Sequence, residues 1–264
     1  MPHRQDVRAA VLTPIPALLR ERGIDPRRIL AGVGLDPGVF ADPDQRIPFA
    51  VAGALLAGCV RATGAPDFAL RVASRLTLAH LGLLAHLMRN SATIGDAITN
   101  LVRHLHLNDR GAVPYFLDLG FGQVAIGYVV YRHATPGIQN VYDLALGVGC
   151  AILRELCGPE WRPVRVSFAH GRPRDPRPWR RHFGAPVEFD APHSEIVFAA
   201  RWLAKGIADA NAANRQVAET AALAVEADGG RIAPRVQRIV HGLVLAGDAN
   251  APHVSALLGL HERA

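Results

Sequence analysis

The segment Val164–Lys205 restricts the possible folds most, because alternating stretches, turns and a short helical stretch follow one another within it. Its first apolar residues alternate with Arg165 and Ser167, which is the period of a half-buried strand. Further along, Gly184 is expected to end a short helix, because glycine readily takes a positive φ. The expected elements, in chain order, are a strand at Val164–Phe168, a helix at Pro176–Phe183, strands at Val187–Phe189 and Ile196–Ala199, and a helical piece around Trp202.

The chain before this segment begins with helical patterns and then changes its hydrophobic period. Residues Val113–Val130 alternate on both sides of a Gly-Phe-Gly turn, which predicts a β-hairpin, and a long amphipathic helix is expected at Asn140–Cys157. Earlier helices are expected at Val7–Gly23, Pro26–Val33, Pro48–Thr63, Asp67–Leu78, Leu81–Arg89 and Ile94–His106. This order predicts an α+β fold in which helices pack on a small antiparallel sheet.

Composition and charge narrow the class of protein. Half of the 264 residues are hydrophobic, which is enough for one sizeable core. We find no apolar run long enough to span a bilayer and no signal-peptide pattern, so we expect a cytoplasmic protein without a membrane partner. The net charge of +6 is compatible with nucleic-acid binding. Cys59, Cys150 and Cys157 lie in apolar stretches, which indicates small buried hydrophobic residues.

Three runs of residues carry a resemblance to a known family. They are V-R-V-S-F-A-H, W-R-R-H-F-G-A-P-V-E-F and I-V-F-x-x-x-W-L, and all lie within Val164–Lys205. They resemble the end of the N-terminal effector domain in one branch of the AraC-type (AraC/XylS) bacterial transcription regulators. That branch carries an arabinose-binding-type domain and includes ornithine-utilisation and virulence regulators. The resemblance extends from about Leu18 to the last residue.

The resemblance implies a ligand-responsive transcription regulator of α+β fold. Its expected partners are a small-molecule effector, promoter DNA and a second copy of the chain in a homodimer. The expected domains are an effector-binding and dimerisation domain at 1–207, a linker helix and hinge at 208–232, and a partial helix-turn-helix domain at 233–264.

The C-terminal residues resemble the beginning of an AraC-type helix-turn-helix. Ser255 and Gly259 lie four residues apart, where small side chains let two helices approach closely. His261 stands where the family usually has Ser, and Arg263 falls in the first turn of the expected recognition helix, which implies a contact with DNA. Because the rest of that helix does not follow, we expect a chain truncated inside the first helix-turn-helix that binds DNA weakly or not at all.

Polar residues in apolar surroundings are the candidates for an effector site. We expect this site between the apolar helices and the sheet, the usual setting for a small-molecule pocket. The candidates are His80, His86, Asn108, Tyr128 and Tyr142. For each of them the alternative is a structural residue whose hydrogen bonds are satisfied within the fold.

Metal, cofactor and enzymatic chemistry are not expected from the motifs. His104 and His106 are two residues apart on a helix and point to different faces, and His80 and His86 are six apart, which is poor spacing for chelation. The sequence contains no GxSxG, HExxH or P-loop motif. The alternative to a regulator is a stand-alone small-molecule-binding module, or a degenerate enzyme, without a role on DNA.

An Arg-rich stretch leaves two interpretations open. Its basic residues are Arg172, Arg174, Arg177, Arg180 and Arg181. They could bind an anionic effector or a DNA phosphate. Alternatively, they belong to a solvated loop, stiffened by proline, whose charges pair with nearby carboxylates.

Overall fold

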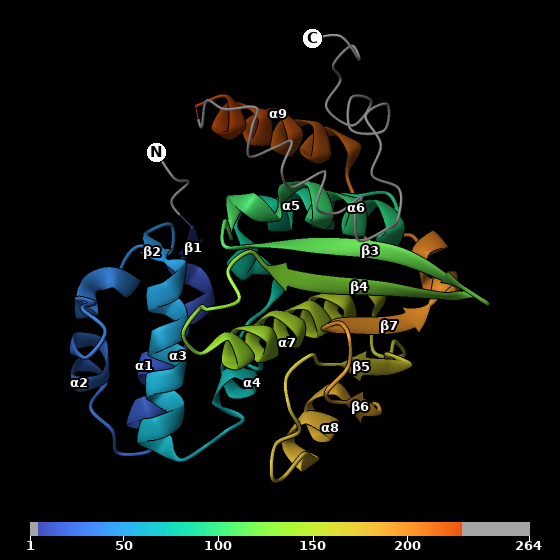
Figure 1. Ribbon diagram of the computed structural model, residues 1–264. Coiled ribbons are helices and arrows are strands. Elements are labelled where there is room, and N and C mark those ends of the chain that lie inside the picture. The colour runs from blue at the N-terminus through green and yellow to red at the C-terminus, as the bar shows by residue number, and fades with distance from the viewer. Residues whose placement is uncertain (1–4, 229–264) are drawn as a thin grey trace, which may run out of the picture.

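Helices and strands follow one another in the α+β order that the hydrophobic pattern predicts. The computed structural model describes residues 5–228 (Figure 1). Its α-helices are α1 (Ile15–Arg20), α2 (Pro26–Ala31), α3 (Phe49–Thr63), α4 (Phe68–Ala73), α5 (Leu83–Arg89), α6 (Ile94–His104), α7 (Ile138–Cys157), α8 (Arg177–Phe183) and α9 (Ala212–Asp228). Its strands are β1 (Asp6–Arg8), β2 (Arg46–Pro48), β3 (Ala112–Gly120), β4 (Gln123–Val130), β5 (Arg165–Ser167), β6 (Val187–Glu188) and β7 (Glu195–Ala199).

Five of the strands form one sheet in the order β3-β4-β7-β5-β6. Ile126 of β4 lies between Phe116 of β3 and Ile196 of β7, and these pairs are antiparallel. The β5–β6 pair is parallel, with Val166 opposite Val187, so the expected antiparallel sheet includes one parallel pair at its end. The reason is α8, because a helical crossover returns the chain to the end of the sheet where β5 began.

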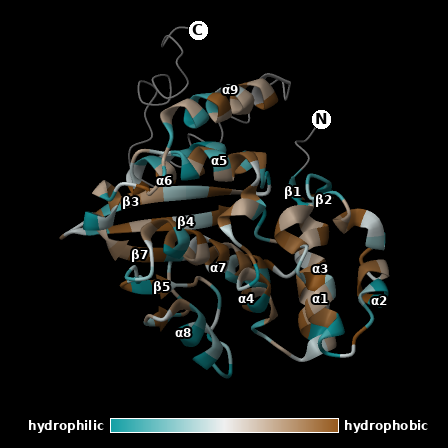
Figure 2. Cartoon of the chain, turned by 180° about the vertical axis from the view of Figure 1, so that it is seen from behind, coloured by the Kyte–Doolittle hydropathy of each residue, from teal (hydrophilic) through white to brown (hydrophobic). Residues whose placement is uncertain are grey.

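Helix α7 runs across one face of this sheet (Figure 1). Ile126, Tyr128 and Ile196 on the strands face the same interior space as Val141 and Leu144 on α7, so the main core lies between the helix and the sheet. Helices α1 to α3 stand beside one end of this layer, α4 packs against α7, and α5 and α6 lie near β3 (Figure 1). The Arg-rich helix α8 is mostly hydrophilic at its outer side (Figure 2).

Local sequence signals set several helix ends. The Asp25 carboxylate accepts a hydrogen bond of 3.0 Å from the Arg27 amide at the start of α2. Thr93 and Asp96 form a capping box at the start of α6. Gly184 ends α8 with a φ of +63°, as the sequence predicts.

The N-terminal segment differs from its prediction. A single helix is expected over Val7–Gly23, but β1 and the 3-10 turn η1 (Ala9–Leu12) precede α1. Strand β1 pairs with β2 on one side, and the Arg8 amide donates to the Asn108 carbonyl on the other. This pairing with residues far along the chain overrides the local helical pattern.

The helix expected at the end of the described region is present as α9. It packs on α5, with Ala218 and Ala222 buried (Figure 1). Ser255, Gly259 and Arg263 lie outside the described residues. No helix within residues 5–228 is both long and apolar enough to cross a membrane.

Candidate functional site

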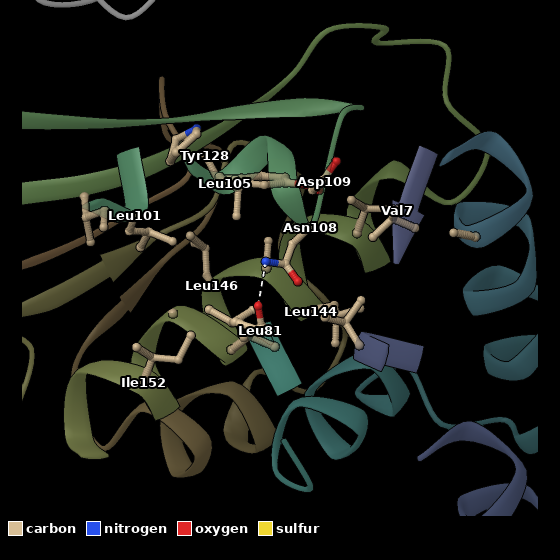
Figure 3. Close-up of a pocket in the computed structure, with 18 of the residues that line it drawn as sticks. Val7, Leu81, Leu101, Leu105, Asn108, Asp109, Tyr128, Leu144, Leu146 and Ile152 are labelled. Atoms are coloured by element: carbon tan, nitrogen blue, oxygen red, sulfur yellow. Dashed lines mark hydrogen bonds between the residues drawn. The ribbon is translucent and has the colours of Figure 1, made fainter. Parts of the chain in front are cut away.

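A cavity of about 120 Å³ lies between α7, the sheet and the helices near the N-terminus (Figure 3). Its walls come from widely separated parts of the chain and are almost entirely apolar. They are Val7, Val11, Leu12, Phe49, Ala52, Leu56, Leu81, Leu101, Leu105, Pro114, Ile126, Gly127, Val141, Leu144, Ala145, Leu146, Val148, Gly149, Ile152 and Ile196, with three polar side chains, Asn108, Asp109 and Tyr128.

Asp109 and Tyr128 form a buried polar pair at this wall. The Tyr128 hydroxyl donates a short hydrogen bond to one Asp109 carboxylate oxygen, and the Gly111 amide donates to the other at 2.7 Å. Burial raises the pKa of Asp109 to about 6, although these donors oppose the shift. Burial and the neighbouring carboxylate raise the pKa of Tyr128 well above its usual value, so its hydroxyl stays protonated.

No cationic side chain in the described region pairs with the Asp109 carboxylate. The positive charge that acts on its pKa is that of Arg46 on β2, which forms no ion pair with it within 4.0 Å. Arg46 pairs instead with Asp6 at 3.2 Å and donates to the backbone carbonyls of Leu107 and Asn108. Within residues 5–228 the charge of Asp109 is therefore stabilised by hydrogen bonds and is not balanced by an ion pair.

Asn108 connects the N-terminal strand to the cavity wall. Arg8 on β1 donates to the Asn108 side-chain oxygen at 2.8 Å and also pairs with Asp44. The Asn108 amide nitrogen donates to the Leu81 carbonyl at 3.0 Å, as the dashed line in Figure 3 marks. The Asn108 side chain thus uses one N–H and one acceptor site within the fold and keeps one N–H.

The other three candidates from the sequence do not line this cavity. The His80 Nδ1 accepts from the Thr77 amide at 3.1 Å and caps the 3-10 turn η3 (Leu78–Leu81). His86 is exposed on α5. Tyr142 on α7 is half-buried, accepts from the Val130 amide at 3.4 Å, and packs its ring edge-on against Tyr128 at 6.0 Å.

Sequence reasoning missed Asp109. It directly follows Asn108 between α6 and β3, so the signal was an acidic residue next to one already selected. A lone Asp before a strand usually forms a turn, and Asp109 does bond the amide of Gly111. Its place beside the cavity depends on Tyr128 and Val7, which the local sequence does not predict.

A second buried polar cluster lies under α8. The Asp143 carboxylate on α7 accepts from the Trp179 indole at 2.7 Å and lies 3.1 Å from His170 Nε2. Burial lowers the pKa of His170. The hydrogen bond to Asp143 and the charge of Asp143 raise this pKa by more than burial lowers it, so the net shift is upward. Phe168 and Phe189 pack around the imidazole, and this cluster holds α8 and β5 on α7.

Metal and anion binding have limited support among the described residues. Within residues 5–228 there is no group of three His, Cys, Asp or Glu side chains placed to hold a metal ion. In the Arg-rich stretch, Arg177 pairs with Asp175 at 2.8 Å. This is one of the local carboxylate pairings expected if the stretch is a solvated loop.

The three cysteines are buried, as their apolar surroundings in the sequence predict. They are Cys59, Cys150 and Cys157, and burial raises the pKa of the Cys150 thiol to about 11.

Two walls of the cavity connect to the segment that leads into α9. At the start of α6, the Ile94 amide donates to the Lys205 carbonyl at 3.0 Å, and the Ile207 amide donates to Ala92 at 3.3 Å. At the end of α7, the Lys205 ammonium donates to the Cys157 carbonyl. The same short segment is therefore hydrogen-bonded at the start of α6 and at the end of α7, two of the helices that line the cavity.

Comparisons with known proteins agree with this fold. A family model described as the arabinose-binding domain of AraC transcription regulators, N-terminal, matches residues 23–207. HTH-type transcriptional regulator VirS of Mycobacterium tuberculosis is 25% identical over 262 residues, 97% of this chain and 76% of VirS. The ornithine utilization regulator of Pseudomonas aeruginosa is 24% identical over 214 residues, 76% of this chain and 59% of that protein.

A solved structure shares the fold. The crystal structure of transcriptional regulator CdpR from Pseudomonas aeruginosa aligns with a TM-score of 0.58 at 18% identity, over 90% of this chain and 75% of CdpR. The family match covers well over half of the chain, from the second helix to the segment before α9. The chain belongs to the family of AraC transcription regulators with an N-terminal arabinose-binding domain.

Proposed function

We propose that this chain senses a small effector for a transcription regulator, and that the cavity beneath α7 is the effector site. One observation carries the proposal: α6 and α7, which line the cavity, are both hydrogen-bonded to the segment that leads into α9. A ligand that moves either helix would therefore act on the helix that follows the sensing domain. The relatives are named as transcription regulators, which favours this function over an enzyme.

The lining residues favour a mostly apolar effector. A sugar presents a hydroxyl on nearly every carbon, and each buried hydroxyl needs a partner. Three of the described lining side chains carry polar groups, and Asn108 is already bonded to Arg8 and Leu81. We therefore propose Tyr128 and Asn108 as effector contacts and leave out His80, His86 and Tyr142 because they do not line the cavity.

The proposed mechanism is a population shift between two arrangements of α9. Effector binding favours one packing of α6 and α7, and the hydrogen bonds at Lys205 and Ile207 pass this preference to α9. In this scheme residues 1–207 sense the effector, residues 208–232 act as linker and hinge, and residues 233–264 begin the DNA-binding part. A ligand shifts the equilibrium only by its difference in affinity for the two arrangements.

A thermal-shift screen against amino acids, fatty acids and other small metabolites tests the effector site. A ligand of the folded state raises the melting temperature in a dose-dependent way. The screen is repeated on Ala145→Leu, which fills the cavity, and on the matched control Ala151→Leu, which lies on α7 but does not line it. We expect the shift to vanish in Ala145→Leu and to persist in Ala151→Leu. Equal shifts in both variants would place the ligand elsewhere.

We also propose that the regulator acts in the cytoplasm as a homodimer on promoter DNA. The support is the family membership and the helix-turn-helix resemblance at Ser255, Gly259 and Arg263. Sedimentation of the protein tests the dimer, and a gel shift at moderate salt against its own promoter tests specific binding. A monomer without preference for promoter sequence would favour a stand-alone ligand-binding module.

A further inference from the structure

We propose that the effector is a small apolar amine whose ammonium group binds at Asp109 and Tyr128. This inference rests on the proposed function, because it names the ligand of the same cavity. The juxtaposition that carries it is a buried carboxylate that has no ion-pair partner among residues 5–228 and that borders a mostly apolar space. An ammonium group is the ligand chemistry that supplies both the missing charge and hydrogen-bond donors.

The hydroxyl proton of Tyr128, in the cavity wall, is already used in a hydrogen bond. The Tyr128 hydroxyl donates to Asp109, so its oxygen is left to accept. The Asp109 carboxylate accepts from Tyr128 and from the Gly111 amide and has further lone pairs. Asn108 adds one N–H beyond the one that it donates to Leu81. The wall therefore offers mainly acceptors, which match a donating head group.

The charges around Asp109 favour a cation over an anion. Arg46 on β2 attracts the carboxylate, but this guanidinium is engaged by Asp6 and by backbone carbonyls. Arg8 on β1 is engaged by Asp44 and Asn108, and Arg110 lies 3.7 Å from Asp6. A carboxylate ligand would place a second negative charge beside Asp109 without a new donor except Asn108. Like charges at such a distance repel strongly in a buried site.

The size of the cavity limits the apolar part of the ligand. Its volume is about 120 Å³. An engineered apolar cavity of roughly 150 Å³ accepts benzene. A body of about six carbons therefore fits with a small adjustment of the walls. Larger amines would require α6 or α7 to move, which is the motion that the sensing mechanism needs.

Isothermal titration of the chain with three ligands of matched shape tests the inference. The ligands are cyclohexylamine, cyclohexanol and cyclohexanecarboxylate at pH 8. We expect cyclohexylamine to bind at least tenfold more tightly than cyclohexanol and cyclohexanecarboxylate to bind most weakly. If the carboxylate binds as tightly as the amine, or if none of the three binds, the inference is overturned.

The Asp109→Asn variant separates a specific pair from general attraction of amines to acidic groups. The preference for cyclohexylamine over cyclohexanol should fall below threefold in Asp109→Asn and stay unchanged in Asp118→Asn, an exposed carboxylate on β3. A preference that survives in Asp109→Asn contradicts the proposal. The two proposals can fail separately. If Ala145→Leu abolishes cyclohexanol binding while the native chain prefers the carboxylate, the cavity remains the effector site but the amine is rejected as its ligand.

A measurement on the native chain does not depend on how a variant folds. Cyclohexylamine stays protonated between pH 5 and 8. Asp109, with a pKa of about 6, takes up a proton as the pH falls from 8 to 5. We expect cyclohexylamine to bind at least fivefold more weakly at pH 5 than at pH 8, and cyclohexanol to change less than twofold. Equal pH dependence for both ligands would contradict the role of Asp109.

Discussion

Asp109 and Asp143 are both buried carboxylates, but their neighbours differ. Asp143 lies 3.1 Å from His170 and accepts from Trp179 at 2.7 Å, among packed aromatic rings. Asp109 accepts from Tyr128 and Gly111, has no cationic partner within 4.0 Å in the described region, and borders a cavity. The first arrangement is complete in itself, whereas the second has unbalanced charge and space beside it.

We propose that this difference separates a structural carboxylate, Asp143, from a ligand-binding one, Asp109. Buried charge is costly unless it is paired and hydrogen-bonded. At Asp143 the partner is part of the chain, so the cluster holds α8 against α7. At Asp109 the described residues supply hydrogen bonds and the more distant charge of Arg46 but no ion pair, so a ligand can still improve the site.

Removing the structural carboxylate should cost the most stability. Asp143→Ala leaves Trp179 and His170 without their common acceptor in a packed region. We expect a loss of about 3 kcal/mol in the free energy of unfolding at pH 7. Urea denaturation followed by circular dichroism measures it. A loss no larger than that of Tyr128→Phe would mean that the cluster is not a structural lock.

Asp109→Asn should change the pH dependence of stability. The folded pKa of Asp109, about 6, lies above its ordinary value of 3.8, so its protonation stabilises the fold below pH 3.8 and this stabilisation is lost as the pH rises through 6. Two pKa units correspond to about 3 kcal/mol. The native chain should therefore lose about that much between pH 4 and 7 relative to Asp109→Asn. Parallel stability profiles from urea denaturation would contradict the unbalanced charge.

Tyr128→Phe should have a smaller effect that depends on the charge of Asp109. The variant removes the hydroxyl that donates to the carboxylate. We expect a loss of about 1.5 kcal/mol at pH 7, where Asp109 is ionised, and a smaller loss at pH 4. Urea denaturation at the two pH values measures the difference. A loss that is the same at both would assign the effect to packing.

An exposed carboxylate provides the lower limit of the comparison. Asp175 pairs with Arg177 on the surface, and this hydrogen bond lowers the pKa of Asp175 to about 2. Because water screens such a pair, Asp175→Ala should leave the urea midpoint unchanged within error. A clear decrease in the midpoint would mean that the Arg-rich stretch contributes more to the fold than a solvated loop does.

Most of the helices and strands could be predicted from local patterns. The long amphipathic period gives α7, the alternation around the Gly-Phe-Gly turn gives β3 and β4, and Gly184 ends α8 where expected. The N-terminal strand β1 could not be predicted, because it forms through pairing with β2 and residues near Asn108. The parallel pairing of β5 and β6 likewise depends on the crossover through α8.

The candidate site was predictable only in part. Asn108 and Tyr128 stand out as polar residues in apolar stretches, and both line the cavity. His80 and His86 have the same local signal, yet one caps a 3-10 turn and the other is exposed. Asp109 gains its environment from β1, β4 and the turn before β3 together. Sequence patterns identify polar residues but do not show which elements converge on them.

Hydrogen–deuterium exchange of the chain with and without cyclohexylamine tests most directly whether the cavity controls α9. Our account predicts slower exchange in α6, in α7 and in the segment around Lys205 that leads into α9, with no such change in Asp109→Asn. Slower exchange at the cavity with unchanged exchange around Lys205 and α9 would contradict the sensing role.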